Sequence, residues 1–309
     1  MSTSTEIIRK PWHQTLKGKE AINFYLFITP WLIGFLIFTL FPIIAAFVLS
    51  FMNYDIMSPP AWIGLENFIE LFSDPLFFTS MWNTLYIVIF AVPLGMIAAF
   101  GMALLLNQKV RGMPIYRTAY YIPSIVPAVA SAALWLYVLQ PQWGLLNSFL
   151  DIFGIQGPGW MGSEVWSKPS IIMLMVWGCG GSMIIYLAGL QDVPKEYYEA
   201  AEIDGAGWWR KFTNVTLPLM TPTIFFNLVM GIIGSFQVFA SAYVAAGNGA
   251  GPLNTLLMYM LLLYRNAFRY FNMGYASAMA LALFVVLVLL TLVLVRTSRS
   301  WVHYEEANR

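Results

Sequence analysis

The sequence predicts an all-α fold, a polytopic membrane bundle of six transmembrane helices with a short cytoplasmic helix between two of them. Two observations carry this prediction. Of the 309 residues, 59% are hydrophobic and 10% are charged, whereas soluble domains are about 45–50% apolar and about 25% charged. The apolar residues also gather in long runs, and a helix of roughly 20 such residues crosses a bilayer. We therefore expect one membrane domain rather than separate soluble ones.

Six apolar runs are long enough to span a membrane. They cover residues 24–51, 79–106, 117–139, 169–190, 218–245 and 272–296. Prolines inside them, such as Pro42 and Pro123, are expected to kink the helices, because neighbouring helices can satisfy the freed carbonyl groups. The first run is much longer than the roughly 7–15 apolar residues of a signal peptide, so we expect it to be retained. The expected parts are an N-terminal tail (1–22), a membrane domain (23–297) and a C-terminal tail (298–309).

The basic residues indicate how the spans are oriented. Thirteen of the sixteen Lys and Arg residues lie in the two tails, in the second connection up to Arg117 and in the fourth connection. With six spans these four segments fall on one side of the membrane, and the positive-inside rule makes that side the cytoplasm. We therefore expect both termini to be cytoplasmic. The other three basic residues are Lys168, Arg265 and Arg269.

The three outer connections differ in character. Residues 52–78 predict a turn followed by a short amphipathic helix on the membrane surface. Residues 140–168 are rich in Gly, Pro and Trp, and we expect them to cover the outer end of the bundle. Residues 246–271 begin with the flexible sequence GNGAGP and continue into an apolar stretch too short for a seventh span. We expect that stretch to form a half-helix in the outer leaflet.

The composition excludes several kinds of function. All 31 Lys, Arg, Asp and Glu residues lie outside or at the ends of the six runs, whereas an ion-coupled carrier usually places ionisable groups within the membrane. The chain has no G-x-x-x-x-G-K-[ST] loop for ATP. His13, His303 and the single Cys179 show no metal-ligand spacing, and a net charge of +1 does not suggest a nucleic-acid partner. We expect no catalytic residue, metal or cofactor in this chain.

An intramembrane enzyme acting on lipid or peptide remains the alternative. Ser182 and Ser235 are the serines it would use, but no span offers a base for them, and a serine in a span more often serves helix packing. A bundle of this kind can otherwise be a passive channel, a structural subunit or a pathway energised by another protein. The last of these requires a cytoplasmic docking element.

The fourth connection, residues 192–218, has the features of such an element. Five acids lie between Asp192 and Asp204, a third of the fifteen in the chain. Asp192 is expected to cap a helix with Pro194 in its first turn, and Gly205 is expected to end it. Ala200 and Ala201 favour the helix and let a partner approach closely. The sequence fits a docking helix, although a solvated loop with one helical turn fits it equally well.

The spacing within this connection resembles a known motif. Glu199-Ala200-Ala201 is followed by three residues, Gly205, nine residues, Val215, one residue and Leu217-Pro218. This resembles the EAA motif of ABC importer permeases, E-A-A-x3-G-x9-I-x-L-P, with Val in place of Ile. Other segments, among them IGLENFIELFSDP, WGLLN and MGYASAMALALFVVL, are similar to the carbohydrate-uptake branch, the maltose and sn-glycerol-3-phosphate type.

The resemblance implies a transport mechanism and a set of partners. The helix from about Lys195 to Ala206 would be a coupling helix in a cleft of a separate ATPase subunit, where ATP and Mg bind, and ATP-driven closure would drive alternating access. The implied coupling residues are Glu199, Ala200, Ala201, Asp204, Gly205, Leu217 and Pro218. The implied partners are a second six-span permease, two ATPase subunits, and an extracellular or periplasmic solute-binding protein. The implied cargo is an oligosaccharide, sugar or polyol, and the implied location is a bacterial or archaeal plasma membrane, surrounded by lipid.

The spans on either side of the motif carry the candidate substrate-pathway residues. Sugar sites combine aromatic faces with groups that form hydrogen bonds, and the resemblance places substrate contacts on these two spans. The candidates are Trp177, Gly178, Gly181, Ser182, Gly234, Ser235, Gln237 and Tyr243. Each also has a structural interpretation, in which glycine and serine allow close helix packing and Gln237 bonds to a neighbouring helix. The maltose-type asparagine is replaced here by Ser235 or Gln237, which leaves the identity of the sugar open.

Overall fold

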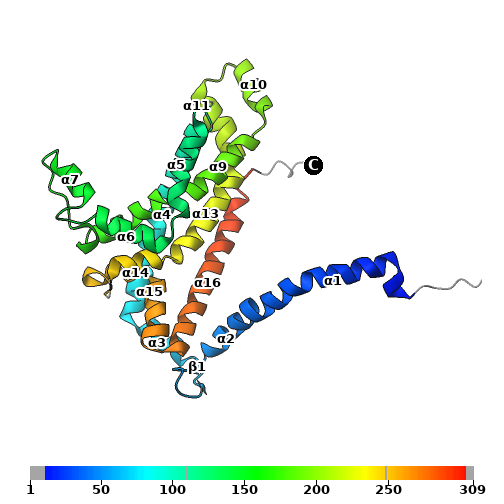
Figure 1. The fold of residues 1–309 in the computed structure, drawn as a ribbon, viewed down its shortest axis with the longest axis vertical. Coiled ribbons are helices and arrows are strands. Elements are labelled where there is room, and N and C mark those ends of the chain that lie inside the picture. The colour runs from blue at the N-terminus through cyan, green and yellow to red at the C-terminus, as the bar shows by residue number, and fades with distance from the viewer. Residues whose placement is uncertain (1–10, 109, 248, 304–309) are drawn as a thin grey trace, which may run out of the picture.

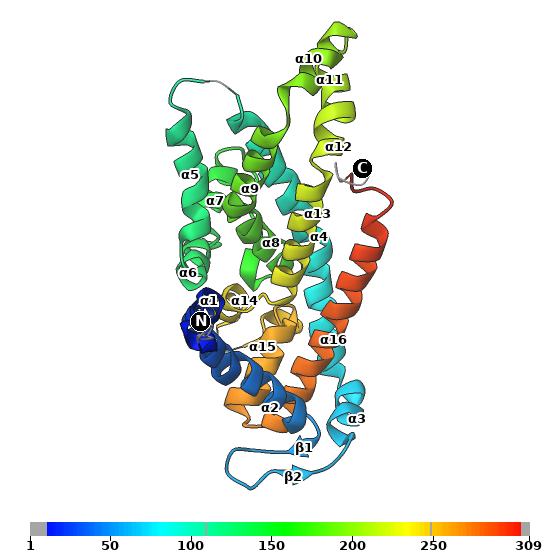
Figure 2. The ribbon, with the colours of Figure 1, turned by 90° about the vertical axis from the view of Figure 1, so that its right-hand side faces the viewer.

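The computed structural model describes residues 11–108, 110–247 and 249–303. The chain forms a bundle of long helices standing side by side, with a short helix at one end and a small hairpin at the other (Figures 1 and 2). The hairpin pairs β1 (Met52–Asn53) with β2 (Ala61–Trp62). The predicted tail residues 1–10 and 304–309, the basic residue Lys109 and Asn248 of the predicted flexible sequence lie outside the described residues.

Helix α4 (Pro75–Leu106) forms the centre of the bundle. Asp74 caps it by accepting a hydrogen bond from the Leu76 N–H at 2.8 Å, and Pro75 occupies the first turn, where its missing N–H is not needed. The helices that pack against it include α8 (Ser167–Trp177), α9 (Gly180–Asp192) and α13 (Thr221–Phe236). The largest core cluster therefore gathers around α4, with α16 (Met273–Ser298) along one side.

The structure confirms a helical bundle with four to six apolar segments able to cross a membrane. Four segments are long enough as they stand: Leu16–Leu49, Pro75–Leu106, Thr221–Ala246 and Met273–Ser298. The first combines α1 (Leu16–Phe35), η2 (Leu36–Leu40) and α2 (Phe41–Leu49), and the third combines α13 and α14 (Ala240–Ala246). Two further helix pairs are each broken by a bend, of 100° between α5 (Met113–Ile125) and α6 (Ala128–Val138) and of 44° between α8 and α9.

The run 117–139, predicted as one kinked span, is divided by the 100° bend into two separate helices, α5 and α6. Val126 has an extended backbone (φ −69°, ψ 132°) and is followed by Pro127. Proline disfavours the helical conformation of the residue before it, so the helix ends at this point. Beyond the bend, α6 packs against α14 instead of continuing along α5.

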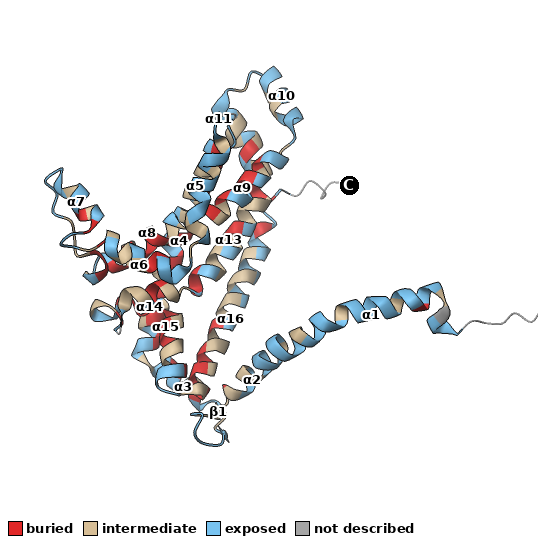
Figure 3. Cartoon of the chain, in the orientation of Figure 1, coloured by how far each residue is buried: buried red, intermediate tan, exposed pale blue. Residues whose placement is uncertain are grey.

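The first apolar segment extends away from the rest of the molecule as an arm (Figure 1). The arm comprises α1, η2 and α2, preceded by the short turn η1 (Trp12–Gln14). Its inner end contacts the body of the protein, where α2 packs against α16. None of its most apolar window is buried within the described chain, and Figure 3 shows α1 mostly exposed, with a buried residue near its start. The arm therefore presents a long apolar surface that this chain alone does not cover.

The predicted turn and short helix in residues 52–78 are the β1–β2 hairpin and α3 (Glu66–Ser73). Asn67 of α3 is buried and donates hydrogen bonds to the carbonyls of Ser50 and Met52, each at 2.9 Å. Leu71, also buried, anchors α3 in the core. In residues 140–168 the structure has α7 (Leu145–Asp151) and the turn η3 (Trp160–Gly162), joined by a 2.6 Å hydrogen bond from Trp160 Nε1 to Asn147.

The stretch of residues 246–271 predicted as a half-helix forms a short helix, and the structure shows that much of it is buried in the bundle. After the turn η5 (Pro252–Asn254), α15 (Tyr259–Tyr264) continues into the π-helical turn η6 (Arg265–Arg269). Tyr259, Leu261 and Leu262 are almost fully buried, and α15 packs against α4. The bonds that draw it inward come from α4, where Asn83 donates to the carbonyls of Asn254 (2.8 Å) and Leu257 (3.2 Å).

Candidate functional site

Helix α10 (Lys195–Ile203) stands at one end of the molecule, beyond the ends of the long helices (Figure 1). It ends in a Schellman motif: Gly205 has a φ of +73°, its N–H bonds to the Glu202 carbonyl at 3.0 Å, and the Ala206 N–H bonds to the Ala201 carbonyl at 2.8 Å. A residue with a Cβ is strained at such a φ, so the glycine sets where this helix stops. The predicted helix end at Gly205 is confirmed.

The predicted start of this helix is wrong in detail. Asp192 is the last residue of α9 and does not cap α10, and Pro194 takes the N-cap position with no side-chain hydrogen bond. Val193 and Pro194 are both extended, which separates the two helices sharply. Since proline restricts the residue before it to extended conformations, the chain leaves α9 one residue before Pro194.

The side chains of α10, which the structure describes in full, are all exposed or half-buried. Glu199, Ala200 and Asp204 at its C-terminal cap are exposed, and Ala201 is half-buried. Ile203 is 87% exposed although it is a large apolar residue. A helix of nine residues is marginal without packing. Helix α10 therefore leaves its small and apolar side chains largely uncovered by the rest of the described chain.

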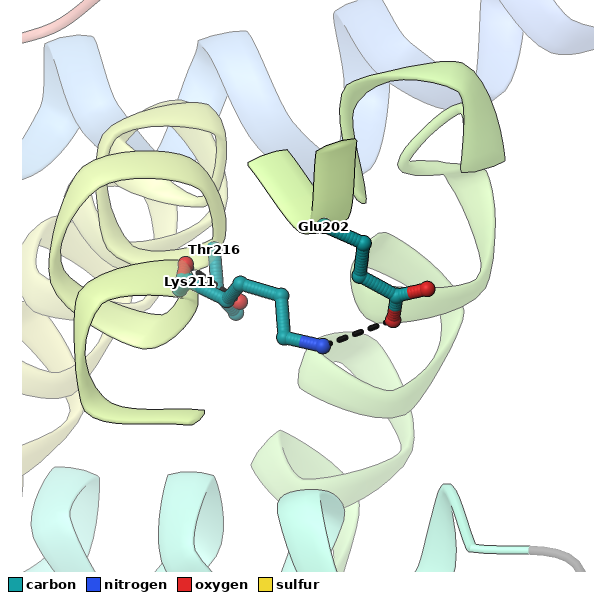
Figure 4. Close-up of polar contacts among 3 residues, drawn as sticks. All are labelled: Glu202, Lys211 and Thr216. Carbon is teal, nitrogen blue, oxygen red and sulfur yellow. Dashed lines mark hydrogen bonds and ion pairs between the residues drawn. The ribbon is translucent and has the colours of Figure 1, made fainter. Parts of the chain in front are cut away.

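Two side-chain contacts hold α10 against the segment that follows it. Lys211 Nζ donates to Glu202 Oε1 at 2.7 Å (Figure 4), and the hydroxyls of Tyr198 and Thr216 are 3.0 Å apart and share a hydrogen bond. Lys211 ends α11 (Trp208–Lys211), and the buried Thr216 ends the π-helical turn η4 (Phe212–Thr216). The sequence analysis missed these four residues, because contacts across a turn leave no periodic signal in the sequence.

Leu217 and Pro218 begin the return into the bundle. They lie in α12 (Leu217–Leu219), with proline in the first turn, directly after η4. Thr221 then donates from Oγ1 to the Pro218 carbonyl at 2.6 Å and accepts a hydrogen bond from the His303 N–H at 2.9 Å. Leu217 and Pro218 therefore lie directly before α13, which begins at Thr221.

The first group of pathway candidates lies at the break between α8 and α9. Trp177 ends α8 and packs edge-on against Trp135 of α6, with ring centroids 6.0 Å apart. Gly178 and Cys179 form the break, and Gly181 and Ser182 lie in the first turn of α9. A Cβ on Gly181 would meet no described atom within 4 Å. Close packing within the described chain therefore does not explain why glycine occupies position 181.

The second group lies where α13 ends and α14 begins. Ser235 is buried, whereas Gly234 and Gln237 are exposed, with Gln237 at the C-cap of α13. Gly234, like Gly181, has no described atom within 4 Å of an added Cβ. Tyr243 of α14 is exposed and packs against Tyr264 at a centroid distance of 5.7 Å. This position is thus also a helix break with polar groups at the surface.

The two groups lie at the breaks where α9 begins and where α13 ends. Helices α9 and α13 pack against each other, and a Cβ on Gly189 would lie 2.8 Å from Thr223 Oγ1. The two helices run in opposite directions (Figure 2), with the same rise per residue. Moving about eight residues away from this contact along each helix leads to Gly181 on α9 and Gly231 on α13. Irregular backbone at membrane depth is tolerated where it is buried in protein or lines a water-filled cavity.

Comparison with known proteins identifies the kind of protein. Residues 91–302 match the family described as the binding-protein-dependent transport system inner membrane component. The chain belongs to this family. It is 44% identical over 290 residues to the probable ABC transporter permease protein YesP of Bacillus subtilis, which covers 93% of this chain and 94% of that protein. It is 35% identical over 277 residues to the arabinooligosaccharides transport system permease protein AraP of the same species, covering 87% and 85%.

A solved structure supports the same assignment. The crystal structure of a bacterial ABC transporter involved in the import of the acidic polysaccharide alginate matches with a TM-score of 0.80. The identity is 26%, and the match covers 91% of this chain and 96% of that one. The resemblance to ABC importer permeases is therefore confirmed, and with it the fold of the membrane domain.

Family membership also decides what this permease does not do itself. ABC transporter permeases form the membrane part of the transporter, and ATP is hydrolysed on a separate subunit. The chain is a transport subunit and not an enzyme. An intramembrane hydrolase is not favoured, and Ser182 and Ser235 lie half-buried and buried within helices, as packing residues do.

Proposed function

We propose that this permease forms half of the translocation pathway of an ATP-driven, binding-protein-dependent importer for an oligosaccharide or a related sugar or polyol. The names of similar proteins support the substrate class. AraP is named as a permease protein of an arabino-oligosaccharide transport system, and the transporter of the matched crystal structure is described as involved in the import of alginate. The solute-binding protein is part of the family's description. The location is the plasma membrane of a bacterium or archaeon, with both termini in the cytoplasm, as the distribution of basic residues favours.

The observation that carries the coupling role is the exposure of α10. Its Glu199-Ala200-Ala201 surface projects beyond the bundle, where an ATPase subunit can receive it in a cleft. Glu199 pairs with a basic residue of that cleft, and the two alanines permit close approach. Gly205 sets the helix end, and Asp204 adds negative charge beside it. ATP and Mg bind to the ATPase, and closure of two such subunits pulls on α10.

Movement of α10 reaches the pathway through α12 and α13. The ion pair joins α10 to α11, and the Tyr198–Thr216 hydrogen bond joins it to η4. Turn η4 continues into α12 with Leu217 and Pro218, and a one-residue turn at Met220 separates α12 from α13. At the far end of α13 lie Gly234, Ser235 and Gln237, with Tyr243 beyond the break. Trp177, Gly178, Gly181 and Ser182 lie at the break between α8 and α9, the helix that packs against α13. Rigid-body rocking of these helices alternately opens the pathway to each side.

A second six-span permease completes the pathway. The apolar arm Leu16–Leu49 is uncovered in this chain, and a homologous subunit offers an apolar bundle of the right length to cover it. The absence of any clash at Gly181 and Gly234 leaves room on the same helices for substrate or for the partner's side chains. Two ATPase subunits then dock, one on each permease.

The coupling role is tested by charge reversal at Glu199. We expect Glu199→Lys to remove most of the sugar-stimulated ATP hydrolysis of the purified complex in lipid, measured with its binding protein and candidate sugars. A charged hydrogen bond at such a contact contributes about 1.5–3 kcal/mol, which is roughly a tenfold or greater loss of docking. Glu164→Lys, an exposed glutamate before α8, serves as the matched control and should keep wild-type activity.

Two results would count against the proposal. Normal sugar-stimulated hydrolysis and transport in Glu199→Lys would remove Glu199 from the coupling contact. Failure of any ATPase subunit to co-purify with the wild-type permease would contradict the importer assignment itself.

A further inference from the structure

The chain turns back after α16 and packs against the start of α13. Residues 299–303 form this segment, which we call the strap, and Figure 2 shows the chain leading from α16 towards α12 and α13. Trp301 packs edge-on against Phe225 of α13, with ring centroids 6.0 Å apart. The His303 N–H donates to Thr221 Oγ1 at 2.9 Å. The strap therefore bonds the end of α16 to the start of α13, across 82 residues of sequence.

Helix α16 is firmly buried at its two ends and less so between them. Its buried residues lie within residues 274–283, apart from Ser298, the last residue before the strap. In the stretch between these two parts, Leu292 and Val293 are each 58% exposed. The first part packs against α2, α3 and η6, and the second continues into the strap, where Val302 is also buried. The strap is thus the second place at which α16 is fixed to the bundle.

The strap lies beside the connection that carries α10. Thr221, which accepts the hydrogen bond from His303, also donates one to the Pro218 carbonyl at 2.6 Å. A hollow of about 250 Å³ is lined by His303 together with Asp192 and Pro194, where α9 ends and α10 begins. Both ends of the connection, the exit from α9 and the return before α13, therefore lie close to the strap.

We propose that the strap makes α16 move together with α13 when α10 is displaced, with Thr221 and Trp301 as its positioning residues. The inference rests on the proposed coupling through α10 and adds a second long helix to the part that moves. Rigid-body gating requires packed helices to keep their relative positions during the movement. The strap provides this at the α10 end of α16, because its contacts are made directly to the first turns of α13. Without them, part of the displacement of α13 is lost as sliding past α16.

Distances between spin labels test the joint movement directly. The labels replace the exposed residues Phe226 on α13 and Val293 on α16, in a complete transporter whose Cys179 is changed to serine. We expect their distance to be the same without nucleotide and with ATP and vanadate, and to differ between these two states in Trp301→Ala. A wild-type distance that changes between the states, or a distance equally constant in Trp301→Ala, would overturn the proposal.

A second pair of labels separates this result from the coupling through α10 itself. One label replaces Ile203, at the exposed end of α10, and the other stays at position 293. We expect ATP and vanadate to change this distance in the wild type. An unchanged distance would contradict the proposed coupling and the strap with it, whereas a changed distance confines any failure of the first pair to the strap.

The ATP hydrolysed per sugar imported by proteoliposomes tests the two positioning residues. Trp301→Ala and Thr221→Val, which removes a hydroxyl at similar size, should each raise this ratio about twofold or more. Trp301→Phe and Thr221→Ser keep the ring and the hydroxyl and should stay near the wild-type ratio. Because both residues act through the strap, the double variant Thr221→Val with Trp301→Ala should raise the ratio no further than the stronger single variant.

Thr297→Val is the matched control, since it removes an exposed hydroxyl from the last turn of α16. It should keep the wild-type ratio, and thermal unfolding of all the complexes reports on folding. Wild-type ratios in both Trp301→Ala and Thr221→Val would overturn the proposal. So would a ratio raised equally in Thr297→Val, or additive effects in the double variant.

Discussion

At the scale of single residues, two adjacent glycines of α9 have opposite surroundings. A Cβ on Gly180 would lie 2.4 Å from the Tyr120 carbonyl oxygen, a distance that real Cβ atoms do not adopt. A Cβ on Gly181 would meet no described atom within 4 Å. Gly180 is therefore required by the close contact of α5 with α9. The sequence analysis chose Gly178 and Gly181 as pathway residues and did not single out Gly180, because spacing along one helix does not show which glycine faces a neighbour.

The pair gives a matched test of this difference. Gly180→Ala should destabilise the permease by about 1–3 kcal/mol, as added methyl groups in tightly packed regions do, and should lower the thermal unfolding midpoint of the purified complex. Gly181→Ala should leave that midpoint close to wild type. Intrinsic tryptophan fluorescence during heating measures both. Equal midpoints for the two variants would mean that α5 and α9 are not in the close contact described.

At the scale of elements, α10 is connected to the bundle by its two chain ends and by two side-chain contacts. The Glu202–Lys211 pair is largely exposed on the Glu202 side (62%) and less so at Lys211 (24%). An exposed ion pair contributes about 0.2–1 kcal/mol to stability. Its value for this permease is therefore geometric, because it fixes the angle between α10 and α11 without much influence on folding.

This geometric role predicts a loss of coupling that a second change restores. Glu202→Lys places two lysines together and should increase the amount of ATP hydrolysed per sugar imported, while the complex stays folded. The exchange of both charges, Glu202→Lys with Lys211→Glu, should restore most of the wild-type ratio. Uptake of labelled sugar and phosphate release in the same proteoliposomes give the ratio. A ratio unchanged in the single variant, or equally poor in both variants, would show that the pair does not transmit movement.

The sequence predicts single helices better than it predicts how they are arranged, because a helix end depends on neighbouring residues whereas packing depends on residues far apart in the chain. The end of α10 at Gly205 follows from one residue's backbone freedom, and α3 follows from the apolar pattern of eight residues. The 100° bend after α5 cannot be predicted from one residue, because Pro127 permits either a mild kink or a complete break. The packing of α6 on α14 decides between the two. For the same reason the close contact of Gly189 on α9 with Thr223 on α13 became visible only when the two helices were placed side by side.

At the scale of the whole molecule, the arm is a long apolar surface that the described part of this chain leaves uncovered. Phe38 on the arm is 80% exposed. We expect a photoreactive benzoyl-phenylalanine at position 38 to crosslink to the second permease on irradiation of the assembled transporter. The same group at Leu190, buried in the bundle, should give no crosslink between subunits. Crosslinking of position 38 to lipid alone, with none to the second permease, would show that the arm lies in the bilayer without a subunit partner.

The exposed arm also has a consequence for the life of the protein in the cell. The arm precedes the other apolar helices of this chain, so it is synthesised before them. It is therefore exposed in the membrane while the rest of the bundle is synthesised. Until a partner arrives, its surface is available to membrane chaperones and proteases that recognise unassembled subunits. In the proposed assembly with a second permease, we therefore expect the half-life of this subunit to depend on the supply of that partner.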